Sequence, residues 1–189
     1  MIAWHPVRSA TMRFAKIYIP LALICLCCLN AGAKSTIKLH EQTQFSAEDE
    51  KVERPAKIPQ DAWKILQKDS LVQDTLSYEN LPTEQLPRSW FLASSVHLNG
   101  PRENDLVVIA NPPLAGGNIT TFWVFLQAPD GMKLVLTQHA HGLIIKSSRS
   151  HGHRNISLVG ATAIRIISAT YRFDGNQYRQ TSLSDKPID

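Results

Sequence analysis

Short runs of β-branched and aromatic residues, each bounded by Gly, Pro, Asn or Asp, follow one another from residue 90 to residue 182. Runs of this kind are typical of strands. The segments between them are too short for the crossover that a parallel pair requires, so successive strands are expected to pair antiparallel. The sequence therefore predicts a mainly β fold, an antiparallel meander that forms a sandwich or a partial barrel. The predicted strands span residues 90–98, 105–110, 119–127, 132–139, 142–148, 155–159, 162–173 and 176–182.

One short N-terminal helix is expected ahead of the strands, over residues 60–73. Trp63 and Leu66 are among the apolar residues that recur there near helical spacing, and Asp61 follows Pro59 in a context typical of a helix start.

The segment 121–127, which contains Trp123 and Phe125, is apolar at nearly every position. A strand with one face in water would alternate apolar and polar residues instead. The pattern indicates a central strand that is covered on both sides, with the helix as one cover. We therefore expect Trp123 to be a buried core residue.

The first part of the chain carries the features of a secretory signal peptide, in the usual order. Arg13 and Lys16 precede the apolar run 17–29, and small residues follow at 31–33. The run of about 13 residues would span roughly 20 Å as a helix, short of a ~30 Å hydrocarbon core, so no stable membrane span is expected. We predict cleavage after Ala33 and a periplasmic or secreted protein.

The chain is expected to have four parts. These are the signal peptide at residues 1–33, a polar leader at 34–58 that is extended or mobile, a single β-rich domain at 59–182 and a tail at 183–189. Translation could start at Met1 or at Met12, which directly precedes Arg13.

Cleavage would change both the thiol content and the charge of the protein. All three cysteines, Cys25, Cys27 and Cys28, lie in the segment to be removed, so the mature domain is cysteine-free and can form no disulfide. Of the 20 basic residues, three precede residue 34, which leaves 17 against 16 acidic residues. This balance gives no indication of nucleic-acid binding.

Four segments together resemble a group of exported bacterial proteins of uncharacterised function. The resemblance covers residues 58 to 180, and it implies export without implying an activity. The segments are HLNG at 97–100, NDLVV at 104–108, TFWVF at 121–125 and YRFDG at 171–175.

The stretch 97–108 also resembles a blade of the FG-GAP repeat, in which an acidic loop binds calcium and leads into a strand. Here Pro101 and Arg102 stand where ligands would be expected, and only Glu103 and Asp105 are charged acceptors. Calcium requires six to eight oxygen ligands. The loop therefore departs from the calcium-binding pattern.

Two His-x-His motifs, at 139–141 and 151–153, have the spacing that lets two imidazoles on one strand face share a metal ion. A strand between them would hold them ~30 Å apart. The turns near 99–104 and 149–154 are expected at the same end of the meander, where His97 could join His151 and His153. This set defines an alternative function, a metal-dependent or serine hydrolase; solvated turn histidines are the favoured interpretation.

A locally cationic turn surrounds the second motif. A loop of this kind can meet an acidic protein or a glycan in the periplasm. The candidate binding residues are His97, Lys146, Arg149, His151, His153 and Arg154.

No nucleophile motif is present, since the sequence lacks a Gly-x-Ser-x-Gly elbow. We accordingly assign no catalytic residue, no metal and no cofactor. The sequence favours an exported, non-catalytic binding protein of the bacterial envelope that holds a protein or an envelope polymer. By analogy, an inhibitor or immunity-type role fits this size and location.

Overall fold

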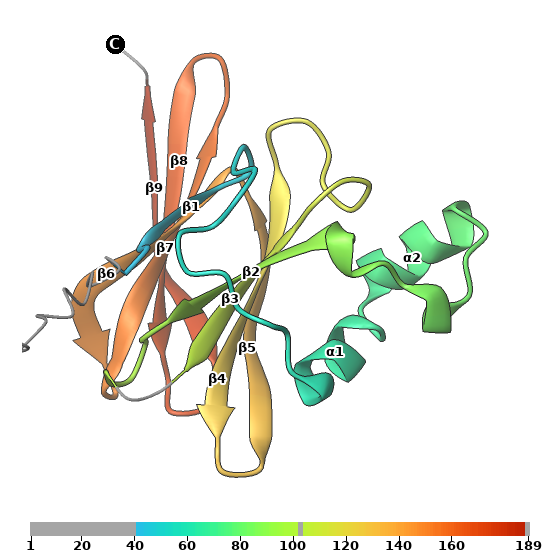
Figure 1. Ribbon diagram of the computed structural model, residues 1–189. Coiled ribbons are helices and arrows are strands. Elements are labelled where there is room, and N and C mark those ends of the chain that lie inside the picture. The colour runs from blue at the N-terminus through green and yellow to red at the C-terminus, as the bar shows by residue number, and fades with distance from the viewer. Residues whose placement is uncertain (1–40, 102–103, 188–189) are drawn as a thin grey trace, which may run out of the picture. The chain divides into compact units, whose positions relative to one another are not determined.

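The computed structural model describes residues 41–101 and 104–187, and the predicted signal peptide and the two possible starts lie outside these residues. Strands make up most of the regular structure and form two antiparallel sheets (Figure 1). The four-stranded sheet contains β2 (Phe91–Val96), β3 (Asp105–Ala110), β4 (Thr120–Ala128) and β5 (Gly131–Ala140). The five-stranded sheet contains β1 (Gln44–Ser46), β6 (Gly142–Ser150), β7 (His153–Ala161), β8 (Arg165–Phe173) and β9 (Tyr178–Pro187).

The strands follow a meander, as the short connections predict. Each strand from β2 to β5 pairs with the next, and the same holds from β6 to β9. The chain passes from one sheet to the other at His141, between β5 and β6. The two sheets enclose a shared apolar core that includes Phe122, Val124 and Ile156. Of the two predicted forms, the sandwich is the correct one.

Two helices lie on the outer face of the four-stranded sheet, and short 3-10 helices lead back into it (Figure 1). The single helix expected at 60–73 is divided into two. The break has a local cause, because Asp69 caps the second helix by accepting a hydrogen bond from the Leu71 amide at 3.0 Å. The elements are α1 (Gln60–Leu66), α2 (Ser70–Tyr78), η1 (Thr83–Gln85) and η2 (Arg88–Trp90).

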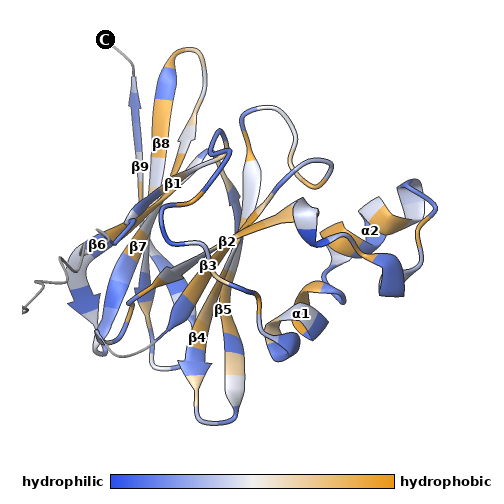
Figure 2. Cartoon of the chain, in the orientation of Figure 1, coloured by the Kyte–Doolittle hydropathy of each residue, from blue (hydrophilic) through white to orange (hydrophobic). Residues whose placement is uncertain are grey.

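Strand β4 is the central strand of the predicted kind, with apolar cover on both faces. Phe122 and Val124 belong to the core between the sheets, whereas Trp123 and Phe125 belong to a second core beneath the helices. Figure 2 shows the apolar colouring that runs along this sheet. Trp123 is fully buried, and its indole Nε1 donates to Asp69 Oδ2 at 2.8 Å, which ties the helical layer to the sheet.

Part of the segment expected to be an extended or mobile leader is structured. Residues 44–46 form β1, which pairs with β6, and Phe45 is buried in the core between the sheets. Farther along, residues 53–59, here called the strap, run beside β2. The Ala56 amide donates to Ala93 O at 2.9 Å, and the Ser95 amide donates to the carbonyl oxygen of Arg54 at 3.0 Å. These residues are extended, the first of the two forms expected for the leader, and they complete two sheet edges.

The predicted tail also belongs to the sheet. Strand β9 continues to Pro187, and its residues pair with β8 as far as Arg165. The polar composition of residues 183–187 misled the prediction, since this part of β9 lies at a largely exposed sheet edge where polar residues are compatible with a strand.

Candidate functional site

Three of the predicted binding residues meet at one end of the sandwich. His97, Arg149 and Arg154 line a shallow hollow of about 340 Å³ together with Glu41, Gly100, Pro101 and Ser147. The turns after β2 and after β6 lie at the same end, because the Arg154 amide donates to Leu98 O at 2.8 Å. The two turns thus lie at the same end of the meander, as the sequence predicts.

Both arginines of this hollow are occupied by internal hydrogen bonds. Arg149 Nη1 donates to Leu98 O at 3.0 Å and to Gly152 O at 2.7 Å. Arg154 donates from Nε to Lys146 O at 2.8 Å and forms an ion pair with Glu41 at 3.0 Å. These guanidinium groups stabilise the turns and hold Glu41. The Lys146 side chain is exposed, and that residue takes part through its carbonyl oxygen.

The three histidines of the alternative site do not converge. His151 Nδ1 donates to Phe173 O at 2.8 Å, and the His153 ring packs on the Phe173 ring with 4.0 Å between centroids. His97 Nε2 accepts a hydrogen bond from Arg54 Nη1 at 3.1 Å, because a guanidinium can only donate. Within residues 41–101 and 104–187, no three His, Cys, Asp or Glu side chains are grouped so that they could hold a metal ion.

The other His-x-His motif makes local contacts as well. His139 Nδ1 lies 2.8 Å from Thr121 Oγ1, and His141 Nδ1 donates to Asn118 O at 2.8 Å. Each ring therefore fixes a neighbouring strand or loop.

Asp105, the acidic residue of the FG-GAP-like stretch, is fully buried and serves the backbone. Its Oδ2 accepts from the Leu98 amide at 2.8 Å, and its Oδ1 accepts from the Gln127 amide at 3.0 Å. Burial raises the pKa of this carboxyl, and the backbone hydrogen bonds oppose that rise. A carboxylate that is occupied in this way braces a turn between β2 and β3.

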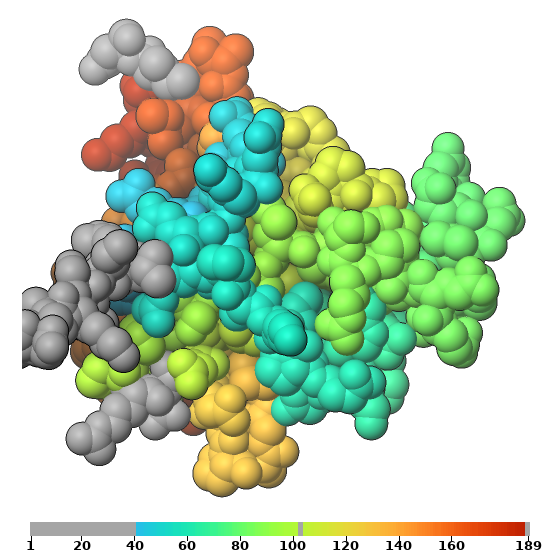
Figure 3. All heavy atoms as spheres, in the orientation of Figure 1, coloured from blue at the N-terminus to red at the C-terminus, as the bar shows by residue number. Residues whose placement is uncertain are grey.

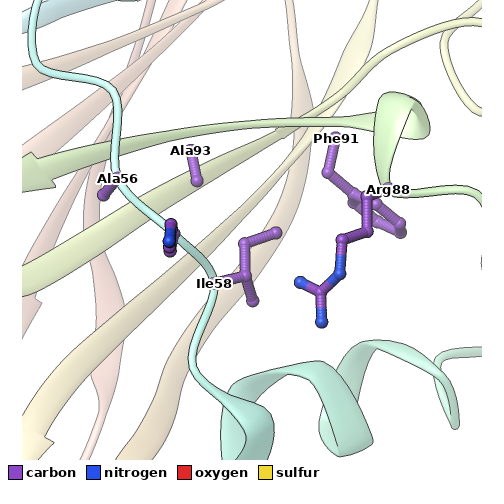
Figure 4. A pocket seen from close by; sticks show the side chains of 6 residues that line it. Ala56, Ile58, Arg88, Phe91 and Ala93 are labelled. Atoms are coloured by element: carbon purple, nitrogen blue, oxygen red, sulfur yellow. The ribbon is translucent and has the colours of Figure 1, made fainter.

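A second hollow, which the sequence did not indicate, lies between the strap and β2. Figure 4 shows it from close by, and Figure 3 shows the strap on the surface beside β2. Phe91 and Ala93 are its buried apolar residues, Ala56 and Ile58 are half-buried, and its volume is about 440 Å³. Two exposed cations, Lys57 and Arg88, complete the lining, and we call this site the Arg88 hollow.

Aromatic stacking holds the Arg88 guanidinium beside the hollow. Its Cζ lies 4.4 Å from the centroid of the Trp63 ring, and Trp63 packs edge-on against Phe91 at 5.4 Å. The guanidinium points toward the space between Ile58 and α1 (Figure 4). Among the described residues, neither Arg88 nor Lys57 has a carboxylate within 4.0 Å. The site thus combines an apolar floor with two cations that have no anionic partner there.

No family model, no curated protein and no solved structure matches this chain in the comparisons with known proteins. In the part of the chain that the structure describes, no helix has both the length and the apolar character needed to cross a membrane.

Proposed function

We propose that the protein is an exported, non-catalytic binding protein of the bacterial envelope, and that the Arg88 hollow is its binding site. The proposed ligand is an acidic peptide segment of a partner protein, in which an apolar side chain stands next to a carboxylate. The observation that carries the proposal is the pairing of buried Phe91 and Ala93 with the two cations at Lys57 and Arg88.

The apolar part of such a ligand would be bound by burial. An apolar side chain that enters the hollow removes its own surface and that of Phe91, Ala93 and Ile58 from water. Each Å² of apolar surface removed contributes about 25 cal/mol. This contribution depends on the shape and size of the ligand's apolar side chain and does not select for charge on the ligand.

The charge selection would come from Arg88. A guanidinium that is stacked on an aromatic ring has lost part of its freedom before the ligand arrives, and its planar fork matches a carboxylate in bidentate fashion. Arg88 is stacked on Trp63 in this manner. Lys57 lies on the strap, across the hollow from Arg88, and adds a second positive charge that favours an acidic segment.

The non-catalytic part of the proposal is supported by the use of the polar side chains elsewhere. His97 accepts from Arg54, while His151 and His153 hold the β6–β7 turn against Phe173. Histidine side chains can serve as bases in hydrolases, and these three histidines are thus engaged in structural contacts instead. An inhibitor or immunity-type role in the envelope is compatible with a site that recognises a protein segment.

Calorimetric titration with a short peptide that carries one phenylalanine between two aspartates tests this proposal. We expect Arg88→Gln to weaken binding by at least about 10-fold, since a hydrogen bond to a charged group contributes about 1.5–3 kcal/mol. Arg172→Gln is the matched control, because Arg172 is an exposed arginine on β8 in the other sheet.

The same peptide with asparagine in place of both aspartates separates charge from burial. It should bind the wild-type protein more weakly and should not distinguish wild type from Arg88→Gln. Equal binding of the acidic peptide to the wild type and to Arg88→Gln would overturn the assignment of the site.

A further inference from the structure

The backbone groups of β2 point alternately toward β3 and toward the strap. The amide of Asn111, the residue that follows β3, donates to Trp90 O at 2.8 Å, so Trp90 and every second residue after it face β3. Ala93 O accepts from the Ala56 amide of the strap at 2.9 Å, in agreement with this alternation. Phe91 and Ala93 therefore direct both their N–H and their C=O groups toward the strap side, where the Arg88 hollow lies.

Two of these four backbone groups have no partner in the chain. The Phe91 amide donates to Arg88 O, and Ala93 O accepts from the strap. Within residues 41–101 and 104–187, no hydrogen bond engages the Phe91 carbonyl oxygen or the Ala93 N–H. Ala93 is only 7% exposed, and buried backbone N–H groups are nearly always paired. An unpaired donor and an unpaired acceptor at the lining of a hollow indicate a ligand that carries both kinds of group.

The strap leaves β2 after Ala56 because it must connect to α1. Pro59 O accepts from the Trp63 amide at 2.8 Å, which is the first hydrogen bond of that helix. Figure 4 shows the strap turning away from β2 between Ala56 and Ile58 and descending toward α1. The part of the β2 edge that borders the hollow is therefore not paired with the strap.

The space beside this edge selects the direction of an added chain. Ala56 holds the place opposite Ala93, so room remains opposite Leu92 and Phe91. In an antiparallel pair, the acceptor for the Ala93 N–H would come from a ligand residue opposite Ala93 itself, where Ala56 lies. In a parallel pair, one residue opposite Leu92 reaches both groups, because it donates to the residue before Leu92 and accepts from the residue after it.

We propose that the acidic peptide of the Arg88 hollow binds as a short strand parallel to β2, with one residue that donates its N–H to Phe91 O and accepts from the Ala93 N–H. This inference rests on the proposed function of the hollow and names the form of its ligand, an extended peptide that extends a sheet edge. Lys57 and Arg88 supply the preference for an acidic chain. An acidic lipid, in contrast, has no N–H group to donate to Phe91 O.

The register also orders the residues of the ligand. Residues that lie opposite each other on neighbouring strands share a face of the sheet. Phe91 and Ala93 belong to the core beneath the helices, whereas Leu92 packs against the core between the sheets. The ligand residue opposite Phe91 thus directs its side chain toward the floor of the hollow and is the apolar residue. The residue that follows it lies opposite Leu92 and forms both main-chain hydrogen bonds.

Calorimetric titration with the acetylated and amidated peptide Asp-Phe-Asp and two N-methylated forms of it tests this pairing. N-methylation of the second aspartate removes the N–H that faces Phe91 O and places a methyl group there, so binding should weaken at least about 10-fold. N-methylation of the phenylalanine is the matched control, because successive N–H groups of an extended chain point to opposite sides, and it should cost less than about 3-fold. Equal losses at the two positions, or a loss confined to the phenylalanine, would overturn the pairing.

Hydrogen exchange of the protein amides gives a second readout. Saturation with the unmodified peptide should slow the exchange of the Ala93 amide at least about 10-fold, because that N–H gains an acceptor. The Ser95 amide is the control, since it already donates to the carbonyl oxygen of Arg54 at 3.0 Å and should exchange at a nearly constant rate. An Ala93 amide that exchanges equally fast with and without bound peptide would overturn the proposal.

The pairing and the assignment of the site fail in different ways. Binding that depends on Arg88 in the Arg88→Gln comparison, but is indifferent to the position of the methyl group, would keep the site and overturn the strand pairing. A peptide that does not bind, or that binds Arg88→Gln as well as the wild type, would overturn the site and the pairing together.

Discussion

At the scale of single residues, Trp123 joins the sheet to the helical layer both by packing and by a hydrogen bond. Trp123→Ala removes a fully buried ring and is expected to lower the free energy of unfolding by about 3–5 kcal/mol. Trp123→Phe keeps most of the ring but leaves the carboxylate of Asp69 without its indole donor, and about 1–3 kcal/mol should be lost. Urea denaturation measures both changes. Lys146→Ala, an exposed control, should stay within about 0.5 kcal/mol, and an equal loss there would contradict the account.

Asp105 should make the stability of the fold depend on pH. Burial raises the pKa of its carboxyl above the ordinary value of 3.8. A group with a raised pKa in the folded chain contributes its full stabilisation below the unfolded-state pKa, and this contribution is lost as the pH rises through the folded-state pKa. As the pH rises from the unfolded-state pKa of Asp105 through its folded-state pKa, the free energy of unfolding of the wild type should therefore fall relative to that of Asp105→Asn.

Asp174 acts in the opposite direction and must be separated from this effect. Hydrogen bonds from the backbone amides of Gln177 and Asn176, and then from Arg179, lower the pKa of its carboxyl to about 2. Its contribution is present above the ordinary pKa and is lost as the pH falls toward 2. The free energy of unfolding is therefore measured from about pH 3 to 7 for Asp174→Asn and for the double variant Asp105→Asn with Asp174→Asn. The difference between these two proteins gives the contribution of Asp105 alone. An unchanged pH slope in Asp105→Asn would contradict this assignment.

At the scale of elements, most strands could be predicted because their apolar patterns and turn residues are local signals. Strand β3 has the predicted bounds, and β4 differs by one residue at each end. Strand β1 could not be predicted, because three residues are too short for a periodic pattern and their stability comes from pairing with β6. The division of the helix follows from the Asp69 cap, a signal that the apolar spacing concealed.

The turn between β4 and β5 positions α1, and Gly131 is the residue that permits this. Asp61 Oδ2 accepts from the Met132 amide, and a Cβ atom at position 131 would lie 2.4 Å from that same oxygen. Gly131 also has a φ of +123°, which side-chain-bearing residues rarely adopt. Gly131→Ala should therefore destabilise the fold by more than the strain of the backbone alone.

Gly152→Ala supplies the comparison for this prediction. Gly152 also has a positive φ, of +79°, but a Cβ atom there would meet nothing within 4 Å. Thermal unfolding should show a larger decrease in Tm for Gly131→Ala than for Gly152→Ala. Equal decreases would mean that the contact with Asp61 contributes nothing and that backbone conformation alone sets the cost.

At the scale of the whole molecule, the sequence located a cationic turn but not the use of its charges. The basic residues of that turn are close together in sequence, so the turn could be predicted. Their acceptors, such as Leu98 O and Glu41, come from distant segments and could not. The Arg88 hollow could not be predicted from the sequence for the same reason. Its floor comes from β2 and its opposite wall from the strap, and only the docking of the strap on β2 creates it.

The central claim is that the Arg88 hollow, and not the cationic turn, is the binding site. Nitrogen–proton correlation spectra of the labelled protein, recorded during titration with the acidic phenylalanine peptide, test this claim most directly. We predict that the indole signal of Trp63 and the amide signals of Phe91 and Ile58 shift and saturate together, while those of Arg149 and His153 stay in place. Saturable shifts confined to Arg149, His153 and their neighbours, with the Trp63 indole unchanged, would contradict the account.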